Sequence, residues 1–206
     1  MQKITRLPYK IGITGTIGAG KSWVGECLWE LGVPVLDTDA VVGELYREDS
    51  RLKQTLAEHF GQVILDMDGG IDKKALAQAV FKDPEALQFL ESVIHPLVGE
   101  KVQAFLEDRS QESPFRAVLV PLLFEAVTED RYDEIWAVTV TPEIKLMERL
   151  MARGGISEEE IQKRMARQLT QSEKARRADR LIDNSGTPKE TCRQVAEALK
   201  VLRERM

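Results

Sequence analysis

Residues 15 to 22 read Gly-Thr-Ile-Gly-Ala-Gly-Lys-Ser, and they constrain this chain more than any other segment. They match the pattern of a phosphate-binding loop, G-x-x-x-x-G-K-[ST], at every fixed position. The preceding segment Tyr9–Thr14 includes β-branched residues and predicts a strand, and Trp23–Leu31 carries apolar residues at helical spacing before Gly32. A strand, a glycine-rich loop and a helix in this order predict an α/β nucleotide-binding fold rather than a turn that matches by chance.

The residue types of this loop suit a polyphosphate ligand. Glycines let the backbone approach phosphate oxygens closely, so that N–H groups and the start of the following helix face the anion. Lys21 is expected to reach the β- and γ-phosphates, and the Ser22 hydroxyl is expected to bind Mg²⁺. The candidate phosphate-binding residues are Gly15, Gly18, Ala19, Gly20, Lys21 and Ser22.

The composition limits the class of protein. The chain has 206 residues, enough for one well-buried core, and its 43% hydrophobic and 31% charged residues are typical of a soluble globular protein. A net charge of −5 argues against a general nucleic-acid binder. The longest uncharged apolar run, residues 117–124, is too short to span a bilayer, and the first residues lack the apolar run of a signal peptide. We therefore expect a cytoplasmic protein with no nucleic-acid or membrane partner.

The metal-binding and redox residue types are few. Cys27 and Cys192 are the only cysteines, and their spacing fits neither a metal site nor a C-x-x-C pair, so we expect two reduced thiols. His59 and His95 are the only histidines, too scattered for a metal site. Considered alone, His95 is expected to be a buried, hydrogen-bonded structural residue.

Two carboxylates, Asp37 and Asp39, follow the second predicted strand, Val33–Leu36. Ligands of open parallel α/β sheets bind beyond the carboxyl ends of strands, so both acids are expected to face the same crevice as the phosphate loop. One or both could help to hold Mg²⁺ or accept a proton from an attacking hydroxyl. The alternative is an Asp that caps a helix starting near Ala40, but two acids beside a phosphate loop favour a functional role.

Residues 40 to about 113 show no second α/β repeat and are expected to be helical. We predict a helix over 40–60, a turn over 66–70 and a helix over 72–81. The sequence Asp-Pro-Glu from residue 83 predicts another helix N-terminus. Pro96 is expected to end that helix and to start a new one over 97–106, because proline is costly inside a helix.

Two further buried strands are predicted over 115–120 and 135–140. Glu125 comes shortly after the first of them, again where a doubly wound sheet binds its ligands. After the second strand, Thr141-Pro142-Glu143 predicts the N-cap and first turn of a helix that runs to about Arg153.

The segment 145–180 carries ten basic and six acidic residues in an otherwise acidic protein. Gly154-Gly155 predicts a hinge, and Ser157 with the three glutamates after it predicts a capping box at the next helix. Arg149 and Arg153 are four residues apart and hence on one helical face. These features favour a helical lid that closes over a triphosphate, although a solvated helix face is the usual fate of such a charge run.

The C-terminal segment predicts a last strand and a last helix. Residues 181–187 indicate a short strand end and a turn in which Asn184 could reach a nucleotide base, although a surface turn fits nearly as well. The residues from Pro188 onward predict an amphipathic helix that packs on the sheet.

Taken together, these motifs resemble the dephospho-CoA kinase family over about residues 10–205. The phosphate loop alone indicates only a nucleotide, whereas the remaining motifs are more specific in their order and spacing. They are Leu36–Asp39, Ile94–Leu97, Val120–Glu125, Arg149 with Arg153, Arg164–Gln168 and Asp179–Gly186.

The resemblance implies an α/β fold: a P-loop kinase core with a parallel sheet flanked by helices, a helical substrate-binding insertion and a helical lid. We expect the core to comprise about residues 9–39, 114–148 and 180–206, the insertion residues 40–113 and the lid residues 149–179. The implied activity is ATP-dependent phosphorylation of the ribose 3′-hydroxyl of dephospho-CoA, the last step in making coenzyme A, with ATP and Mg²⁺ as cofactors. We expect a monomer or weak homo-oligomer.

The resemblance also implies residue roles. Asp39 matches the general base near the acceptor hydroxyl, and Lys21 and Arg149 complete the catalytic set. Lid residues Arg149 and Arg153, and the adenine contact at Asn184 with Gly186 in its loop, join the phosphate loop in binding ATP. The substrate-binding candidates are Asp37, Asp39, His95, Leu123 and Glu125.

The loop departs from the family's usual Gly-Gly-Ile-Gly-Ser-Gly-Lys-Ser-Thr at Thr16, Ala19 and Trp23. Trp23 stands among the cofactor-binding positions, but it replaces a hydroxyl that could bond the α-phosphate. Because Lys21 and Ser22 remain, we expect weaker ATP affinity rather than lost activity.

Two other functions stay open at this point. One is another phosphate-loop kinase that acts on a nucleoside or nucleotide. The other is a nucleotide-dependent binding module such as a GTP switch: residues 66–69 fit D-x-x-G, but no guanine-reading N-K-x-D motif is present.

Overall fold

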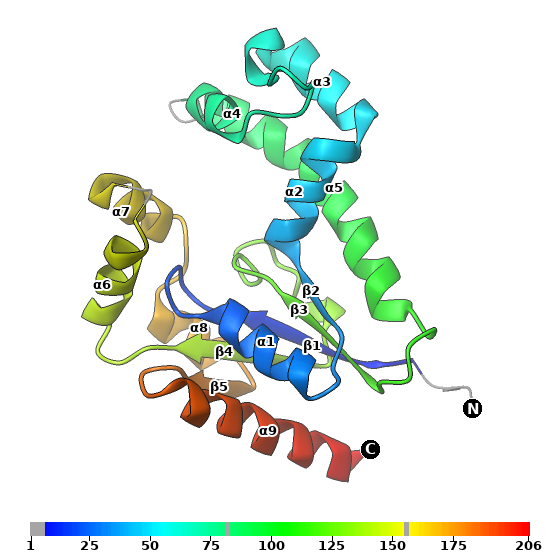
Figure 1. Ribbon diagram of the computed structural model, residues 1–206, viewed down its shortest axis with the longest axis vertical. Helices are drawn as coiled ribbons and strands as arrows, with labels where there is room; N and C mark the ends of the chain where they lie inside the picture. The colour runs from blue at the N-terminus through cyan, green and yellow to red at the C-terminus, as the bar shows by residue number, and fades with distance from the viewer. Residues whose placement is uncertain (1–6, 81–82, 155–156) are drawn as a thin grey trace. The chain divides into compact units, whose positions relative to one another are not determined.

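The computed structural model describes residues 7–80, 83–154 and 157–206; the side chains of Arg153 and Glu160 also lie outside the described part. Five strands form one sheet in the order β2-β3-β1-β4-β5, and every neighbouring pair is parallel (Figure 1). The strands are β1 (Tyr9–Thr14), β2 (Val35–Asp37), β3 (Phe115–Leu119), β4 (Glu134–Thr139) and β5 (Arg180–Asp183). The predicted α/β fold with a parallel sheet is therefore confirmed.

The chain divides into two compact units, Met1–Asp37 with Leu106–Met206, and Thr38–Phe105. The first contains the whole sheet. Its helices are α1 (Lys21–Glu30), α6 (Ile144–Arg153), α7 (Glu158–Ala166), α8 (Gln171–Arg177) and α9 (Pro188–Arg205), with a 3₁₀ turn η2 (Glu129–Arg131).

The sheet carries a different layer on each face, because successive residues of a strand point to opposite sides. Ile11 and Ile13 of β1 are fully buried in the main core with apolar residues of α1 and α9, such as Leu28 and Leu199. Between them, Gly12 faces the other side, where an added Cβ would lie 2.8 Å from Leu123 and Tyr132. A smaller apolar cluster therefore covers that second face; it comprises Leu123, Phe124 and Ile135, with Val120, Tyr132, Leu169 and Ala178 packed around it.

The second unit is helical, as predicted for this part of the chain. It contains α2 (Thr38–Glu48), α3 (Ser50–Phe60), η1 (Gln62–Ile64), α4 (Lys73–Val80) and most of α5 (Pro84–Glu107). Lys101 of α5 and Glu44 of α2 form an ion pair of 3.3 Å. The predicted turn over 66–70 is present, closed by an Asp66 side chain that accepts from the backbone N–H groups of Asp68 and Gly70.

Two helix predictions in this unit were wrong. The predicted helix over 40–60 is divided at Asp49, whose side chain accepts from the backbone N–H of Leu52 and caps α3. Pro96 does not end a helix, since α5 continues from Pro84 to Glu107 around it. A proline costs one intrahelical hydrogen bond, and a helix of this length, with buried residues such as Ile94 and Val102 on either side of the proline, absorbs that cost.

Thr141 does not cap the helix that follows β4. The Thr141–Pro142 peptide is cis, and α6 begins only at Ile144, with Glu143 at the N-cap position. The predicted end of this helix at Arg153 agrees with the structure. The capping box predicted after Ser157 includes Glu160, whose side chain lies outside the described residues, as does Gly155 of the predicted hinge.

The prediction of two free thiols was also wrong. Cys27 of α1 and Cys192 of α9 form a disulfide, with their Cα atoms 5.3 Å apart. The two helices pack against each other over the main core, so residues separated by 165 positions meet there. Spacing along the sequence gave no sign of this pairing because it depends on tertiary packing.

Within the described residues, no helix combines the length and the apolar character that a membrane crossing requires.

Candidate active site

The phosphate loop lies between β1 and α1, as the motif predicts. Gly18 and Gly20 have φ angles of 84° and 93°, in the left-handed region that glycine adopts without a steric cost. Gly20 is the N-cap of α1, which has no side-chain cap and no acidic residue in its first turn. The N–H groups at the start of α1 therefore favour an anion.

Lys21, the first residue of α1, extends back along the loop. Its Nζ donates a 2.9 Å hydrogen bond to the backbone carbonyl of Gly15, the first residue of the motif. The ammonium thus lies across the loop, and its hydrogen bond joins the start of α1 to the first residue of the motif.

Ser22 and Asp37 line one open pocket of about 370 Å³, together with residues of α1, β2 and β3. A hydroxyl and a carboxylate oxygen are the hard donors that Mg²⁺ takes, with phosphate oxygens and water completing its shell. The two side chains therefore fit a magnesium ion. The same pocket contains Glu26 and the exposed Trp29, neither of which the sequence motifs indicated.

Asn184 braces the phosphate loop. Its side-chain Nδ2 donates to the carbonyl of Ala19 at 2.8 Å, and its Oδ1 accepts from the Thr191 hydroxyl at 2.9 Å. A Cβ added to Gly20 would overlap the Asn184 amide, so the glycine and the asparagine fit each other. The Asn184 side chain is buried, and both of its polar atoms have partners in the protein. An adenine contact by Asn184 and the loop that follows it, which contains Gly186, therefore stays a proposal.

Helix α6 contacts the loop from another side. A Cβ on Gly18 would lie 3.1 Å from the Leu146 carbonyl and from Leu150, so α6 approaches this glycine closely. On the same helix, Arg149 donates from Nη2 to the backbone carbonyl of Asn184 at 2.8 Å. Arg149 is thus tied to the residue that holds Ala19. The side chain of Arg153, the other predicted lid arginine, lies outside the described residues.

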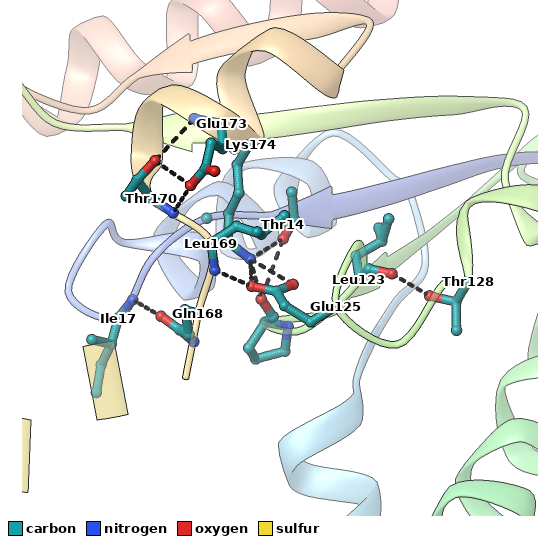
Figure 2. A network of polar contacts seen from close by, with 12 residues as sticks. Thr14, Ile17, Leu123, Glu125, Thr128, Gln168, Leu169, Thr170, Glu173 and Lys174 are labelled. Carbon is teal, nitrogen blue, oxygen red and sulfur yellow. Dashed lines mark hydrogen bonds and ion pairs between the residues drawn. The ribbon is translucent and has the colours of Figure 1, made fainter. Parts of the chain in front are cut away.

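Glu125 is the centre of a polar network on the second face of the sheet (Figure 2). It forms an ion pair of 2.8 Å with Lys174 of α8, whose side chain is 1% exposed. Its Oε1 also accepts from the backbone N–H of Leu169 at 2.7 Å. Burial lowers the pKa of Lys174, and the hydrogen bond and charge of Glu125 oppose that shift. Sequence reasoning placed Glu125 near the site but missed Lys174, which was one lysine of a charge run.

The remaining candidates lie in different settings. Leu123 is fully buried in the apolar cluster on the second face, so its side chain packs in the core, and its role in substrate binding stays a prediction. Trp23 is half-buried and its indole N–H donates to the Pro188 carbonyl at 3.3 Å, which ties α1 to α9.

Asp39 and His95 belong to the helical unit. Asp39 is exposed in the first turn of α2, where the helix dipole favours a carboxylate. His95 is exposed on α5, so the expectation of a buried histidine was wrong.

The family model and the curated relatives indicate the same family. The family model described as Dephospho-CoA kinase matches residues 9–190. A dephospho-CoA kinase of Symbiobacterium thermophilum is 40% identical over 189 residues, which cover 91% of this chain and 79% of that protein. A solved protein of Thermus thermophilus superposes with a TM-score of 0.82 at 37% identity, covering 98% of this chain and 100% of the other.

A dephospho-CoA kinase structure from Campylobacter jejuni superposes with a TM-score of 0.65 at 22% identity, over 95% of this chain and 97% of that one, and shows the shared fold. The family model spans most of the chain, including the phosphate loop, Asp39, Glu125 and Asn184. This chain therefore belongs to the dephospho-CoA kinase family.

Proposed function

We propose that this chain, with the dephospho-CoA kinase activity of its family, transfers the γ-phosphoryl group of ATP to the ribose 3′-hydroxyl of dephospho-CoA. The observation that carries the proposal is the anion-binding start of α1, where Lys21 lies across the loop and Ser22 shares a pocket with Asp37. Phosphoryl transfer depends mainly on positioning and charge neutralisation, which these groups provide.

The phosphate loop binds the triphosphate through backbone N–H groups, and Lys21 neutralises the β- and γ-phosphates. The Lys21 ammonium leaves the Gly15 carbonyl to do so. Ser22 and Asp37 would hold Mg²⁺, which would supply charge neutralisation at the phosphate oxygens.

Asp39 accepts the proton of the ribose hydroxyl as that oxygen attacks phosphorus. Its position supports this role, because it is an exposed carboxylate two residues beyond the end of β2. The proton passes to the Asp39 carboxylate. The bond between the γ-phosphorus and the ADP oxygen breaks, and a new bond forms between this phosphorus and the ribose 3′-oxygen. His95 remains a proposed substrate contact in the helical unit.

Arg149 and Arg153 belong to the proposed lid, residues 149–179, and stabilise charge on the transferring group. For Arg149 the support is its hydrogen bond to Asn184 beside the loop. Closure of this lid over ATP would also exclude water, which would otherwise hydrolyse the nucleotide.

Product analysis by mass spectrometry tests the proposed reaction. After incubation with Mg-ATP, dephospho-CoA should gain one phosphoryl group on the ribose 3′-oxygen, and the Lys21→Ala variant should give almost none. Phosphorylation of AMP or a nucleoside in place of dephospho-CoA would support another phosphate-loop kinase instead. Nucleotide binding without any transfer would support a binding module.

From membership of this enzyme family we further propose a cytoplasmic location, dephospho-CoA as the small-molecule partner, and a monomer or weak homo-oligomer. Sedimentation at micromolar concentration tests the oligomeric part of this proposal.

A further inference from the structure

A single buried ammonium joins three parts of the sheet edge that carries the phosphate loop. Besides Glu125, Lys174 Nζ donates to the Pro121 carbonyl at 2.7 Å and reaches the Thr14 hydroxyl at 3.4 Å (Figure 2). Thr14 is the last residue of β1, immediately before the loop, and Pro121 follows β3 by two residues. Four oxygens therefore surround a side chain that is 1% exposed.

Glu125 connects this buried charge to the segment between α7 and α8. Its carboxylate accepts from the N–H of Leu169 at 2.7 Å. The preceding residue, Gln168, accepts from the backbone N–H of Ile17 at 2.8 Å through its Oε1. Ile17 is the third residue of the phosphate loop, so one hydrogen bond and one peptide unit separate Glu125 from the residue that contacts the loop.

The start of α8 is fixed independently. Thr170 and Glu173 form a capping box, and Gln171 exchanges hydrogen bonds of 2.7 and 3.0 Å with the backbone N–H and carbonyl of Val140, just after β4. The start of α8 thus fixes the backbone of Lys174, while Glu125, Pro121 and Thr14 hold its ammonium at the sheet edge.

We propose that Glu125 and Lys174 are a positioning pair for the phosphate loop, acting through Gln168 on Ile17. The pair holds Leu169 at the sheet edge, which keeps the side-chain amide oxygen Oε1 of Gln168 aligned with the Ile17 N–H and so fixes the loop in its nucleotide-binding conformation. Neither residue of the pair touches the reacting groups in this proposal. Its consequence is a specific loss: variants should bind ATP more weakly without a matching loss of turnover.

The reason is that the loop binds ATP through backbone groups. The loop binds the phosphates only in the conformation that points its N–H groups at them. If the loop adopts this conformation for only a fraction of the time, its apparent affinity for ATP is multiplied by that fraction. Once ATP is bound, its phosphates hold the loop, so turnover at saturating ATP is largely retained.

The test uses the full chain and measures the dissociation constant of a non-hydrolysable ATP analogue by calorimetry. This readout needs no acceptor, so it stays informative even if the proposed reaction fails. The variants are Glu125→Gln, which removes the charge, Gln168→Ala, which removes the acceptor for Ile17, and the double variant. Gln168 is half-buried and lies outside the apolar clusters, so its variant is expected to fold even if Glu125→Gln does not.

Each single variant should weaken analogue binding about 5- to 10-fold, because Gln168→Ala removes the acceptor for the Ile17 N–H and Glu125→Gln removes the charge that pairs with Lys174. The double variant should bind no more weakly than about the weaker single variant, because both act on the same contact. In kinase assays the KM for ATP should rise in proportion while kcat changes less than about twofold.

The matched control is Glu134→Gln. Glu134 is 7% exposed in its side chain and pairs with Arg180 at 2.9 Å, but it starts β4, at the end of the sheet opposite to the loop. This variant loses a buried ion pair as Glu125→Gln does, yet it should leave analogue binding unchanged. Unchanged affinity in Gln168→Ala, multiplying effects in the double variant, or an equal loss in the control would each overturn the proposal.

Discussion

Arg149 Nη2 donates a 2.8 Å hydrogen bond to the backbone carbonyl of Asn184. The Asn184 side chain in turn donates to the carbonyl of Ala19, so the proposed lid and the phosphate loop meet at one residue of the loop after β5. Arg149 is therefore connected through Asn184 to Ala19 of the phosphate loop. This relationship joins three segments that lie 35 and 165 residues apart along the chain.

The variant Asn184→Ala should weaken both the fold and nucleotide binding. It removes a partner of the Ala19 carbonyl and of the Thr191 hydroxyl, two buried groups. The Thr191 hydroxyl still has the Thr187 carbonyl at 3.4 Å as an acceptor, so the Ala19 carbonyl is the group that loses its partner. That loss costs about 1–3 kcal/mol, and unfolding in urea should show a decrease in this range. Calorimetry with an ATP analogue should show weaker binding as well. Unchanged affinity would mean that the loop keeps its shape without this brace.

Val127→Gly should stabilise the protein. Val127 has a φ of 51° and closes a turn in which the Thr128 N–H donates to the Leu123 carbonyl and the Val127 N–H to the Phe124 carbonyl. This is a Schellman arrangement, in which the left-handed position prefers glycine. Relief of about 1–2 kcal/mol of steric cost exceeds the added unfolded-state entropy of about 0.5–1 kcal/mol.

The measurement is the urea midpoint of unfolding. Val127 is 79% exposed, so its removal loses little apolar burial. The control Val63→Gly, at a valine that is 75% exposed in η1 and has no left-handed φ, should be neutral or destabilising. A lower midpoint for Val127→Gly would contradict the assignment of strain.

Reduction of the Cys27–Cys192 disulfide should destabilise the protein. The bond closes a loop of 165 positions, and disulfides contribute about 2–4 kcal/mol by restricting the unfolded chain. The melting temperature should therefore fall when dithiothreitol is added. The variant Cys192→Ser should melt at the lower temperature with or without the reductant. Equal melting of the oxidised and reduced wild-type protein would show that the bond contributes nothing.

Alkaline pH should weaken the fold through its tyrosines. Burial raises the pKa of Tyr46 and of Tyr132 to about 12, above the ordinary value of 10.0. The native state keeps these phenols protonated while the unfolded chain ionises them, so this stability is complete below pH 10 and is lost as the pH rises towards 12. The free energy of unfolding lost in this way is about 1–3 kcal/mol for each tyrosine.

Tyrosine absorbance at 295 nm checks this directly. In the native protein two of the three tyrosines should titrate near pH 12, and the variant Tyr46→Phe should remove part of that step. Titration of all three near pH 10 while the protein remains folded would contradict the burial argument.

The sheet and the phosphate loop were predictable from the sequence because their signals are local. A strand, a glycine-rich loop and a helix start are written in consecutive residues, and the observed β1 coincides with the predicted segment Tyr9–Thr14. The continuity of α5 through Pro96 was not predictable in this way, since packing along a whole helix outweighs one local penalty. The Cys27–Cys192 bond likewise depends on two helices meeting over the core.

In the candidate site, too, residues with a local sequence signal were predictable and residues that depend on tertiary contacts were not. Lys21, Ser22 and Asp37 were found from motif and strand position. Lys174 was missed because its partners lie 160, 53 and 49 residues away, and nothing in its neighbourhood distinguishes it from an exposed helical lysine.

The roles of site residues also depend on tertiary contacts. The bracing role of Asn184 is visible only once Ala19 and Thr191 lie beside it. A motif therefore identified the residue, whereas the fold revealed what its side chain contacts.

The most direct test of the account is the turnover number of Asp39→Asn with saturating Mg-ATP and dephospho-CoA, measured beside its affinity for ATP. Loss of a general base lowers turnover by about 10²–10⁴-fold, and nucleotide affinity should stay within about twofold because the phosphate loop is untouched. Turnover close to that of the wild type, or a collapse of ATP affinity, would contradict the proposal that Asp39 takes the acceptor proton.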